Sequence, residues 1–186
     1  MAGHHKQGRY FVGKGRGTQM PETNTHGAPR INFTDPAFGG LLKAMYGLEA
    51  PLQNSGLEPK LRELVKIRAS QINGCAFCLD MHTKDARAQG EAEQRIYALS
   101  AWRETPFFTD RERAALEWTD HLTLIAGHDV PDDLYGRVRA QFSEEEVAQL
   151  TLAVVQINGW NRLVKSFRPV VGSYQPPQHQ GNASAA

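Results

Sequence analysis

Apolar residues recur along the middle of the chain at intervals of three and four positions, which is the spacing of one face of an α-helix. One such series follows Pro59 and ends near Asn73, and a longer one extends from Val147 to Phe167. Strands would show apolar and polar residues in alternation, with tight turns between them, and Asn73-Gly74 lies instead between helical patterns. The sequence therefore predicts an all-α fold.

Capping residues divide this pattern into separate helices. Thr109-Asp110-Arg111-Glu112 and Ser143-Glu144-Glu145-Glu146 match the capping box, in which a hydroxyl caps the first turn and a glutamate caps it in return. Gly74 can adopt a left-handed conformation and is expected to end the helix that Pro59 opens. The expected helices run from Pro36 to Tyr46, Pro59 to Asn73, Cys75 to Gln89, Ala92 to Trp102, the Thr109 box through Leu122, a short segment after Pro131, and the Ser143 box to Phe167.

The length and composition predict one domain. The chain has 186 residues, of which 40% are hydrophobic, enough to bury a single core. We predict a single-domain helical bundle over residues 31–172. Residues 1–30 and 173–186 show no helical period and are rich in polar residues, glycine and proline, so both are predicted to be disordered.

The charge and the ends of the chain bear on its partners and location. A formal net charge of +1 gives no reason to expect nucleic acid or a membrane surface as a partner. No apolar stretch reaches transmembrane length, and the N-terminus lacks the apolar centre of a signal peptide. We therefore expect a cytoplasmic protein without a membrane partner.

The two cysteines of the chain, Cys75 and Cys78, form a CxxC motif. Secreted domains stapled by disulfides have several well-separated cysteines, so this pair indicates redox chemistry or metal binding. Zinc would take both cysteines and His82, with Glu63 or another histidine as fourth ligand, but structural zinc sites usually use a second, distant pair. Two inert core cysteines are the remaining alternative. We favour a redox pair, with no metal and no bound cofactor.

The spacing around the motif indicates how the pair could be activated. If a helix begins near Cys75, both sulfurs lie in its first turn, where free N–H groups and the helix dipole favour a thiolate. His82 follows Cys78 by four positions on the same helix face, so it could accept the thiol proton directly or through water. Glu63, on the preceding helix, could orient the imidazole.

Glu63, the Cys75-Ala76-Phe77-Cys78 segment and His82 together match the pattern E-x11-C-x-x-C-x-x-x-H. This pattern resembles the alkylhydroperoxidase D core within the carboxymuconolactone decarboxylase superfamily, and the likeness extends over roughly residues 31–172. The surrounding segments INGCAFCLDMHTKDARAQGE and QINGWNRLVKSFR are also similar to that family. The resemblance implies an alkylhydroperoxidase D-like helical fold and a homo-oligomer, a trimer or a hexamer.

The resemblance also implies a role for each site residue. Cys78 would attack an alkyl hydroperoxide, Cys75 would resolve the sulfenic acid into a disulfide, and His82 and Glu63 would relay protons. A lipoyl-type or thioredoxin-type dithiol would then reduce the disulfide. Lactone decarboxylases of the superfamily lack the CxxC, which argues against their chemistry here.

One departure from the family pattern leaves other functions open. Characterised peroxidases of this type have a histidine immediately before the second cysteine, where this chain has Phe77. The alternatives are a general thiol–disulfide oxidoreductase without efficient peroxidase activity, and a non-catalytic oligomeric stress or interaction protein. For the family-like segment of the last helix we expect Trp160 to pack in a core or subunit interface, rather than line an active-site entrance, and Arg162 to pair with a carboxylate.

Overall fold

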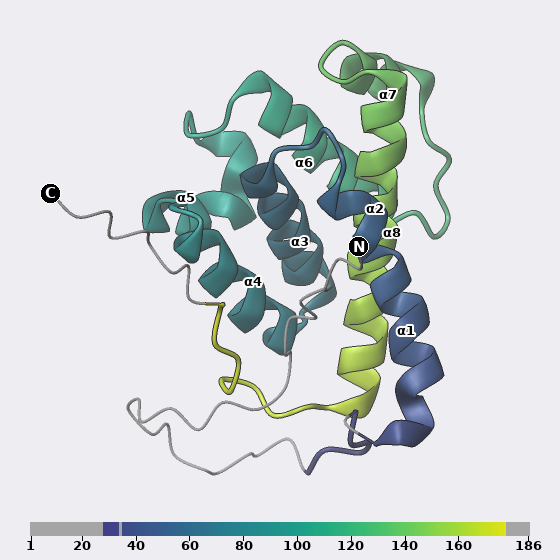
Figure 1. Cartoon of the computed structure of the whole chain (residues 1–186). Coiled ribbons are helices and arrows are strands. Elements are labelled where there is room, and N and C mark those ends of the chain that lie inside the picture. Colours follow the sequence, from purple (N-terminus) through teal and green to yellow (C-terminus); the bar gives the residue numbers. More distant parts are fainter. Residues whose placement is uncertain (1–27, 34, 178–186) are drawn as a thin grey trace, which may run out of the picture.

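The computed structural model describes residues 28–33 and 35–177, and its regular structure over those residues is entirely helical (Figure 1). The prediction of an all-α, single-domain fold is confirmed. None of the described helices combines the length and the apolar character that a membrane crossing requires.

The helices follow one another closely. Their bounds are η1 Pro36–Phe38, α1 Gly39–Gly47, α2 Glu49–Gln53, α3 Pro59–Asn73, α4 Ala76–Ala88, α5 Glu93–Ala98, η2 Leu99–Glu104, α6 Asp110–Thr123, α7 Asp132–Arg139 and α8 Glu144–Phe167.

Helix α3 is the centre of the bundle. It packs against α4, α6 and α8, and α1 and α2 lie along α8 on the other side (Figure 1). The side chains of Leu64, Val65 and Ile67 on α3 are completely buried. A helix that is covered on several faces in this way holds its polar residues in fixed positions, which matters for Glu63 and Ser70.

Capping interactions set the starts of α6 and α8 as the sequence predicts. Thr109 Oγ1 accepts a hydrogen bond from the Glu112 N–H (3.2 Å), and Glu112 Oε2 accepts one from the Thr109 N–H (2.8 Å). Ser143 and Glu146 make the same reciprocal pair at α8. Each box satisfies two backbone donors that the first helical turn leaves unpaired.

The turn between α3 and α4 positions the cysteines. Gly74 has φ 61° and ψ 43°, a left-handed conformation that residues with a Cβ rarely adopt, and the Cys75 N–H donates to the Ser70 carbonyl (2.9 Å). The chain therefore reverses within one residue, and α4 begins immediately after Cys75.

The predicted helix from Ala92 to Trp102 is divided in the structure. Helix α5 passes into the 3₁₀-helix η2, and Ala101 has non-helical angles (φ −115°, ψ 32°). The Trp102 side chain is buried there, and its Nε1 donates to Asp120 (3.2 Å). The prediction of one helix over this segment was thus wrong, because the spacing of apolar residues does not distinguish an α-helix from a 3₁₀-helix.

The C-terminal segment is ordered further than the sequence predicts. Tyr174 is buried, its hydroxyl donates to Asp85 Oδ1 (2.7 Å), and its carbonyl accepts from Lys84 Nζ (3.0 Å). Disorder from residue 173 onwards is therefore the wrong prediction at Tyr174, whose aromatic ring and hydroxyl both find partners on α4. Residues 1–27 and 178–186 lie outside the described residues, so for them disorder stays a prediction.

Candidate active site

Helix α4 places the two cysteines in its first turn. Cys75 is the N-cap residue, with extended backbone angles, and Cys78 is the third residue of the helix. Both are free thiols, and each is only 1% exposed. The unpaired N–H groups at a helix start favour an anion, so the position suits a thiolate as the spacing predicts.

The two thiols share a proton unequally. The thiol of Cys78 donates a hydrogen bond to the Cys75 sulfur, and this is the main reason why the pKa of Cys75 is lowered to about 7. Burial opposes the shift. The Cys78 backbone N–H, the charge of Lys165 and the Asn161 side chain each add to the lowering. The pKa of Cys78 is raised, chiefly because its proton is held in that hydrogen bond and because the site is buried. In the reduced pair the anion therefore resides on Cys75 and the proton on Cys78.

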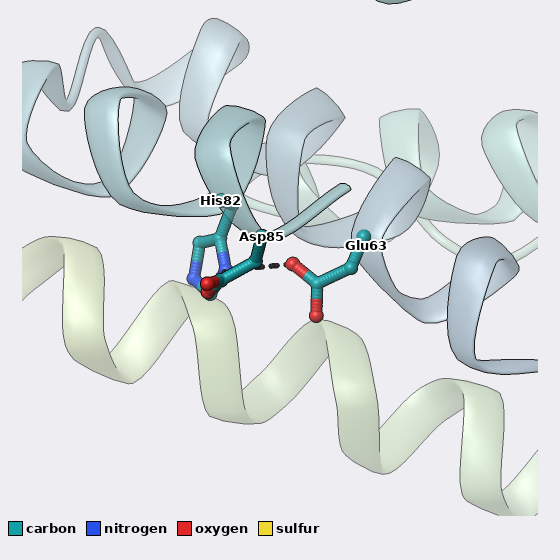
Figure 2. A group of neighbouring side chains, drawn as sticks. All are labelled: Glu63, His82 and Asp85. Atoms are coloured by element: carbon teal, nitrogen blue, oxygen red, sulfur yellow. Dashed lines mark hydrogen bonds and ion pairs between the residues drawn. The ribbon is translucent and has the colours of Figure 1, made fainter. Parts of the chain in front are cut away.

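His82 and Glu63 form a buried pair between α4 and α3, as Figure 2 shows. His82 Nδ1 lies 2.9 Å from Glu63 Oε2, and both residues are 6% exposed. No hydrogen bond joins the His82 ring to either sulfur among the described residues. His82 is therefore not placed to take the thiol proton of Cys78 directly, which was one of the two predicted routes. Transfer of that proton to His82 would need a bridging water or substrate.

Opposite charges on α3 and α4 keep Glu63 ionised. Burial would raise the pKa of Glu63, but the charges of Lys66 and His82 and their hydrogen bonds outweigh it and lower the pKa to about 2. Lys66 Nζ lies 3.3 Å from Glu63 Oε1. Glu63 is therefore a carboxylate over the physiological range, which fixes the imidazole beside it.

A second carboxylate, Asp85, faces the same imidazole from one turn further along α4. Its Oδ2 lies 3.9 Å from His82 Nδ1 (Figure 2). Its Oδ1 accepts a hydrogen bond from the Tyr174 hydroxyl. Burial raises the pKa of Asp85, although the Tyr174 hydrogen bond opposes the shift. Asp85 was not among the site residues predicted from the sequence, and its spacing of three positions from His82 was the available signal.

These groups border a small, mainly apolar cavity of about 50 Å³, enough for a water molecule or a small substrate group. Cys78 and His82 both line it, whereas Cys75 does not. The complete lining consists of Phe33, Tyr46, Glu49, Phe77, Cys78, Met81, His82, Asp85, Trp160 and Val164.

Two aromatic residues of the lining bear on the sequence-based expectations. Phe77 takes the position of the family's extra histidine and presents an apolar ring to the cavity. Trp160 also lines the cavity, and its ring centroid lies 5.5 Å from that of Tyr46. Trp160 therefore packs against the core cluster, as expected, and it also lines the cavity, which was the less favoured prediction. Tyr46 belongs to α1, so a helix distant in sequence helps to close the cavity.

Behind the cysteines lies a polar cluster that sequence reasoning did not assign to the site. Asn161 of α8 is 1% exposed; its Nδ2 donates to Ser70 Oγ (3.1 Å) and its Oδ1 accepts from Asn73 Nδ2 (2.8 Å). Arg162 donates to the Asn158 carbonyl and Oδ1 (2.9 and 3.0 Å), so its predicted carboxylate partner is wrong. The backbone and side-chain oxygens of Asn158, on the same helix, accept the hydrogen bonds of the Arg162 guanidinium instead.

The donors of the hypothetical zinc site do not gather around one point. Among the described residues, the group whose ligand atoms lie within 4.8 Å of one another is Glu63, His82 and Asp85, without either cysteine. Lys66 already places a positive charge beside this group, and the Glu63–His82 hydrogen bond occupies two of its atoms. The arrangement fits proton handling better than cation binding.

Comparisons with known proteins agree with this structure. A family model described as the carboxymuconolactone decarboxylase family matches residues 36–121. The uncharacterised protein YdfG of Bacillus subtilis is 50% identical over 134 residues, which are 72% of this chain and 90% of that protein. The chain belongs to the carboxymuconolactone decarboxylase family. The matched region contains Glu63, Cys75, Cys78 and His82 and ends within α6, so Asn161 lies beyond it.

Solved structures connect this member of the carboxymuconolactone decarboxylase family with the alkylhydroperoxidase D type. A protein of unknown function from Agrobacterium tumefaciens, described as a candidate antioxidant defence protein AhpD, is 46% identical with a TM-score of 0.74, covering 77% of this chain and 98% of that one. An uncharacterised peroxidase-related protein with an alkylhydroperoxidase AhpD core, from Ralstonia eutropha, is 19% identical with a TM-score of 0.65, covering 76% and 77%, and shows the fold alone.

Proposed function

We propose that this protein is a thiol-dependent peroxidase that reduces alkyl hydroperoxides through a dithiol–disulfide cycle of Cys78 and Cys75. The observation that carries the proposal is that Cys78 lines a small apolar cavity together with His82, while Cys75, its hydrogen-bonded partner, lies behind it. An apolar wall that includes Phe77 and Trp160 suits the organic part of an alkyl hydroperoxide.

The first step forms a sulfenic acid. Transfer of the shared proton from Cys78 to Cys75 puts the anion on the sulfur that faces the cavity. This thiolate attacks the terminal oxygen of ROOH, the O–O bond breaks, and the sulfur is oxidised by two electrons as the peroxide is reduced. The alkoxide leaves as ROH after taking a proton, which imidazolium at His82 can supply while Glu63 stabilises its charge.

The second step closes the cycle. Cys75 loses the proton that it took from Cys78, and its thiolate attacks the sulfur of Cys78–SOH; the S–O bond breaks, and the leaving hydroxide takes up that proton and departs as water. An external dithiol, of the lipoyl or thioredoxin type, then exchanges with the disulfide. The donor is itself oxidised to a disulfide, and both thiols of the protein are restored. Because the cycle depends on such a donor, we place it in a reducing compartment, the cytoplasm.

Thiol counting tests this function. Reduced protein mixed with tert-butyl hydroperoxide should lose both thiols per chain and form one disulfide, and dihydrolipoamide should restore them. Cys75→Ser should trap a dimedone-reactive sulfenic acid at Cys78, whereas Cys78→Ser should not react with peroxide. Unchanged thiols in the wild-type protein, or full turnover by Cys78→Ser, would refute the proposal.

A general thiol–disulfide oxidoreductase is the second candidate, and Phe77 is the observation that favours it. A phenyl ring lines the cavity at the position of the family's extra histidine and cannot carry a proton. On this alternative the protein exchanges disulfides with a small dithiol substrate but consumes peroxide slowly. Oxidation of the thiols by a disulfide such as lipoamide, without oxidation by peroxide, would favour it.

We also propose that the protein forms a homo-oligomer. Val155 on α8 is 54% exposed and Leu41 on α1 is 37% exposed, so apolar residues remain uncovered on adjacent helices. Light scattering coupled to size exclusion should give a mass of three or six chains; a monomer at micromolar concentration would contradict this. A stable oligomer with inert thiols would instead support the non-catalytic interaction protein.

A further inference from the structure

Apolar residues surround much of the cysteine pair, but buried polar side chains on α3 and α8 lie close to it. Cys75 and Cys78 belong to a cluster with Ala69, Ile157 and Val164. Within these surroundings Asn161 and Ser70 are buried to 1% and 0% exposure, respectively. Polar side chains buried so completely cost free energy unless they are hydrogen-bonded, so their partners indicate what they do.

A chain of hydrogen bonds sets the direction of the Asn161 amide. Asn158 Nδ2 donates to Thr123 Oγ1 (3.1 Å), so its Oδ1 is turned toward Asn73 Nδ2, from which it accepts (3.0 Å). Asn73 Nδ2 also donates to Asn161 Oδ1 (2.8 Å). The Asn161 oxygen is therefore occupied, and its Nδ2 is turned toward Ser70 Oγ (3.1 Å).

The free donors of this network lie close to the thiols, since the Ser70 carbonyl itself accepts the Cys75 N–H (2.9 Å). Asn161 acts to lower the pKa of both Cys75 and Cys78, and Ser70 acts to lower that of Cys78, so both favour the thiolate over the thiol. Since Asn161 Nδ2 carries two hydrogens and Ser70 takes one, the second is available to a sulfur. Hydrogen bonds to an ion are about twice as strong as those between neutral groups, which offsets part of the cost of a buried anion.

We propose that Asn161 and Ser70 are positioning residues of the thiol pair, holding both sulfurs and donating hydrogen bonds to whichever sulfur carries the anion. This inference rests on the thiol–disulfide function proposed above. The cycle needs the anion first on Cys78, for attack on the peroxide, and then on Cys75, for attack on the sulfenic acid. Asn161 favours the thiolate form of both cysteines and so serves both steps.

The experiment measures the acidity of the thiols in the full-length reduced protein. The rate of iodoacetamide alkylation is followed against pH by mass spectrometry. Asn161→Asp keeps the side-chain size but replaces the donor by a negative oxygen, and Ser70→Ala removes one hydroxyl. Asn161→Asp should raise the alkylation midpoint by about one pH unit, making alkylation near pH 7 about five-fold slower, because only the thiolate reacts. Ser70→Ala should raise it by less.

Thr119→Val is the matched control. Thr119 is a fully buried hydroxyl that donates to the Ala115 carbonyl of its own helix, α6 (2.7 Å). The Thr119→Val variant should keep the wild-type alkylation midpoint even if its melting temperature falls, since a loss of stability alone does not alter the acidity of the thiols. Should Asn161→Asp fail to fold, Ser70→Ala decides.

Wild-type midpoints retained in both variants, or an equal shift in Thr119→Val, would overturn the inference. Its failure is distinct from failure of the proposed function. If the midpoint moves as expected but the wild-type thiols do not react with alkyl hydroperoxide, the peroxidase proposal is refuted and the positioning role is supported. If the wild-type thiols react with peroxide while both variants keep the wild-type midpoint, the positioning role is refuted and the peroxidase proposal is supported.

Discussion

His82 Nδ1 lies 2.9 Å from Glu63 Oε2, so an imidazole on α4 and a carboxylate on α3 are joined inside the bundle. The two residues are 19 positions apart, and the turn at Gly74 brings their helices together. A carboxylate that is ionised and buried, hydrogen-bonded to a ring nitrogen, fixes the orientation of the ring.

Loss of that carboxylate should slow peroxide reduction. For Glu63→Gln we expect the rate of peroxide-driven thiol loss to fall about ten-fold, because the imidazole loses its charged partner. The control is Glu91→Gln, which removes a buried carboxylate paired with Arg95 (2.8 Å) at the start of α5, away from the cavity. An equal loss of rate in Glu91→Gln would show that the effect is not specific to the site.

The same carboxylate makes stability depend on pH. The pKa of Glu63 is depressed from 4.5 to about 2 in the folded chain, so its contribution is fully present above pH 4.5 and is lost as pH falls toward 2. Urea unfolding should therefore show wild type losing about 2 kcal/mol more than Glu63→Gln between about pH 6 and pH 3. Parallel losses in the two proteins would contradict this assignment.

Lys165 should contribute to the acidity of Cys75. Its charge helps to lower the pKa of Cys75 to about 7, after the hydrogen bonds from Cys78, and its ammonium donates to the Asn73 carbonyl at the α3–α4 turn. Lys165→Gln should raise the alkylation midpoint by a few tenths of a pH unit at low salt, and by less at high salt, because the lysine is exposed. Lys43→Gln, on α1, should change nothing.

A histidine at position 77 should improve peroxide turnover. Phe77 is buried in the cavity wall, and Phe77→His would place a proton-carrying ring beside Cys78. We expect an increase of about ten-fold in the rate with alkyl hydroperoxide. Phe77→Leu, the apolar control, should show no increase. A rate that does not change in Phe77→His would mean that proton supply does not limit the reaction.

The hydroxyl of Tyr174 should stabilise the fold. Tyr174→Phe removes the hydrogen bond to Asp85 and should cost about 1 kcal/mol in urea unfolding, the usual contribution of a side-chain hydrogen bond. Tyr97→Phe is the control: its hydroxyl bonds Glu93 (2.7 Å), but the side chain is 71% exposed, so we expect no measurable change. Similar effects of the two substitutions would contradict a packed C-terminal segment.

Helix positions were predictable wherever the signal is local. The capping boxes at Thr109 and Ser143 and the left-handed Gly74 depend on residues within one turn of each other, and all three are confirmed. The η2 winding at Ala101 and the burial of Tyr174 depend on partners 18 to 90 positions away. Local patterns contain no information about such partners, which is why both predictions were wrong.

The sequence by itself determined most of the helices, the turn that starts α4 at Cys75, and the placement of Cys78 and His82 on one helix, because helical period and capping are local properties. Only the tertiary structure decided that Cys78 rather than Cys75 faces the cavity, and that Asn161 bonds Ser70, 91 positions away in the sequence. Those relationships depend on how α8 packs against α3 and α4. That packing is a compromise among all the side chains of the core, so no single spacing in the chain encodes it.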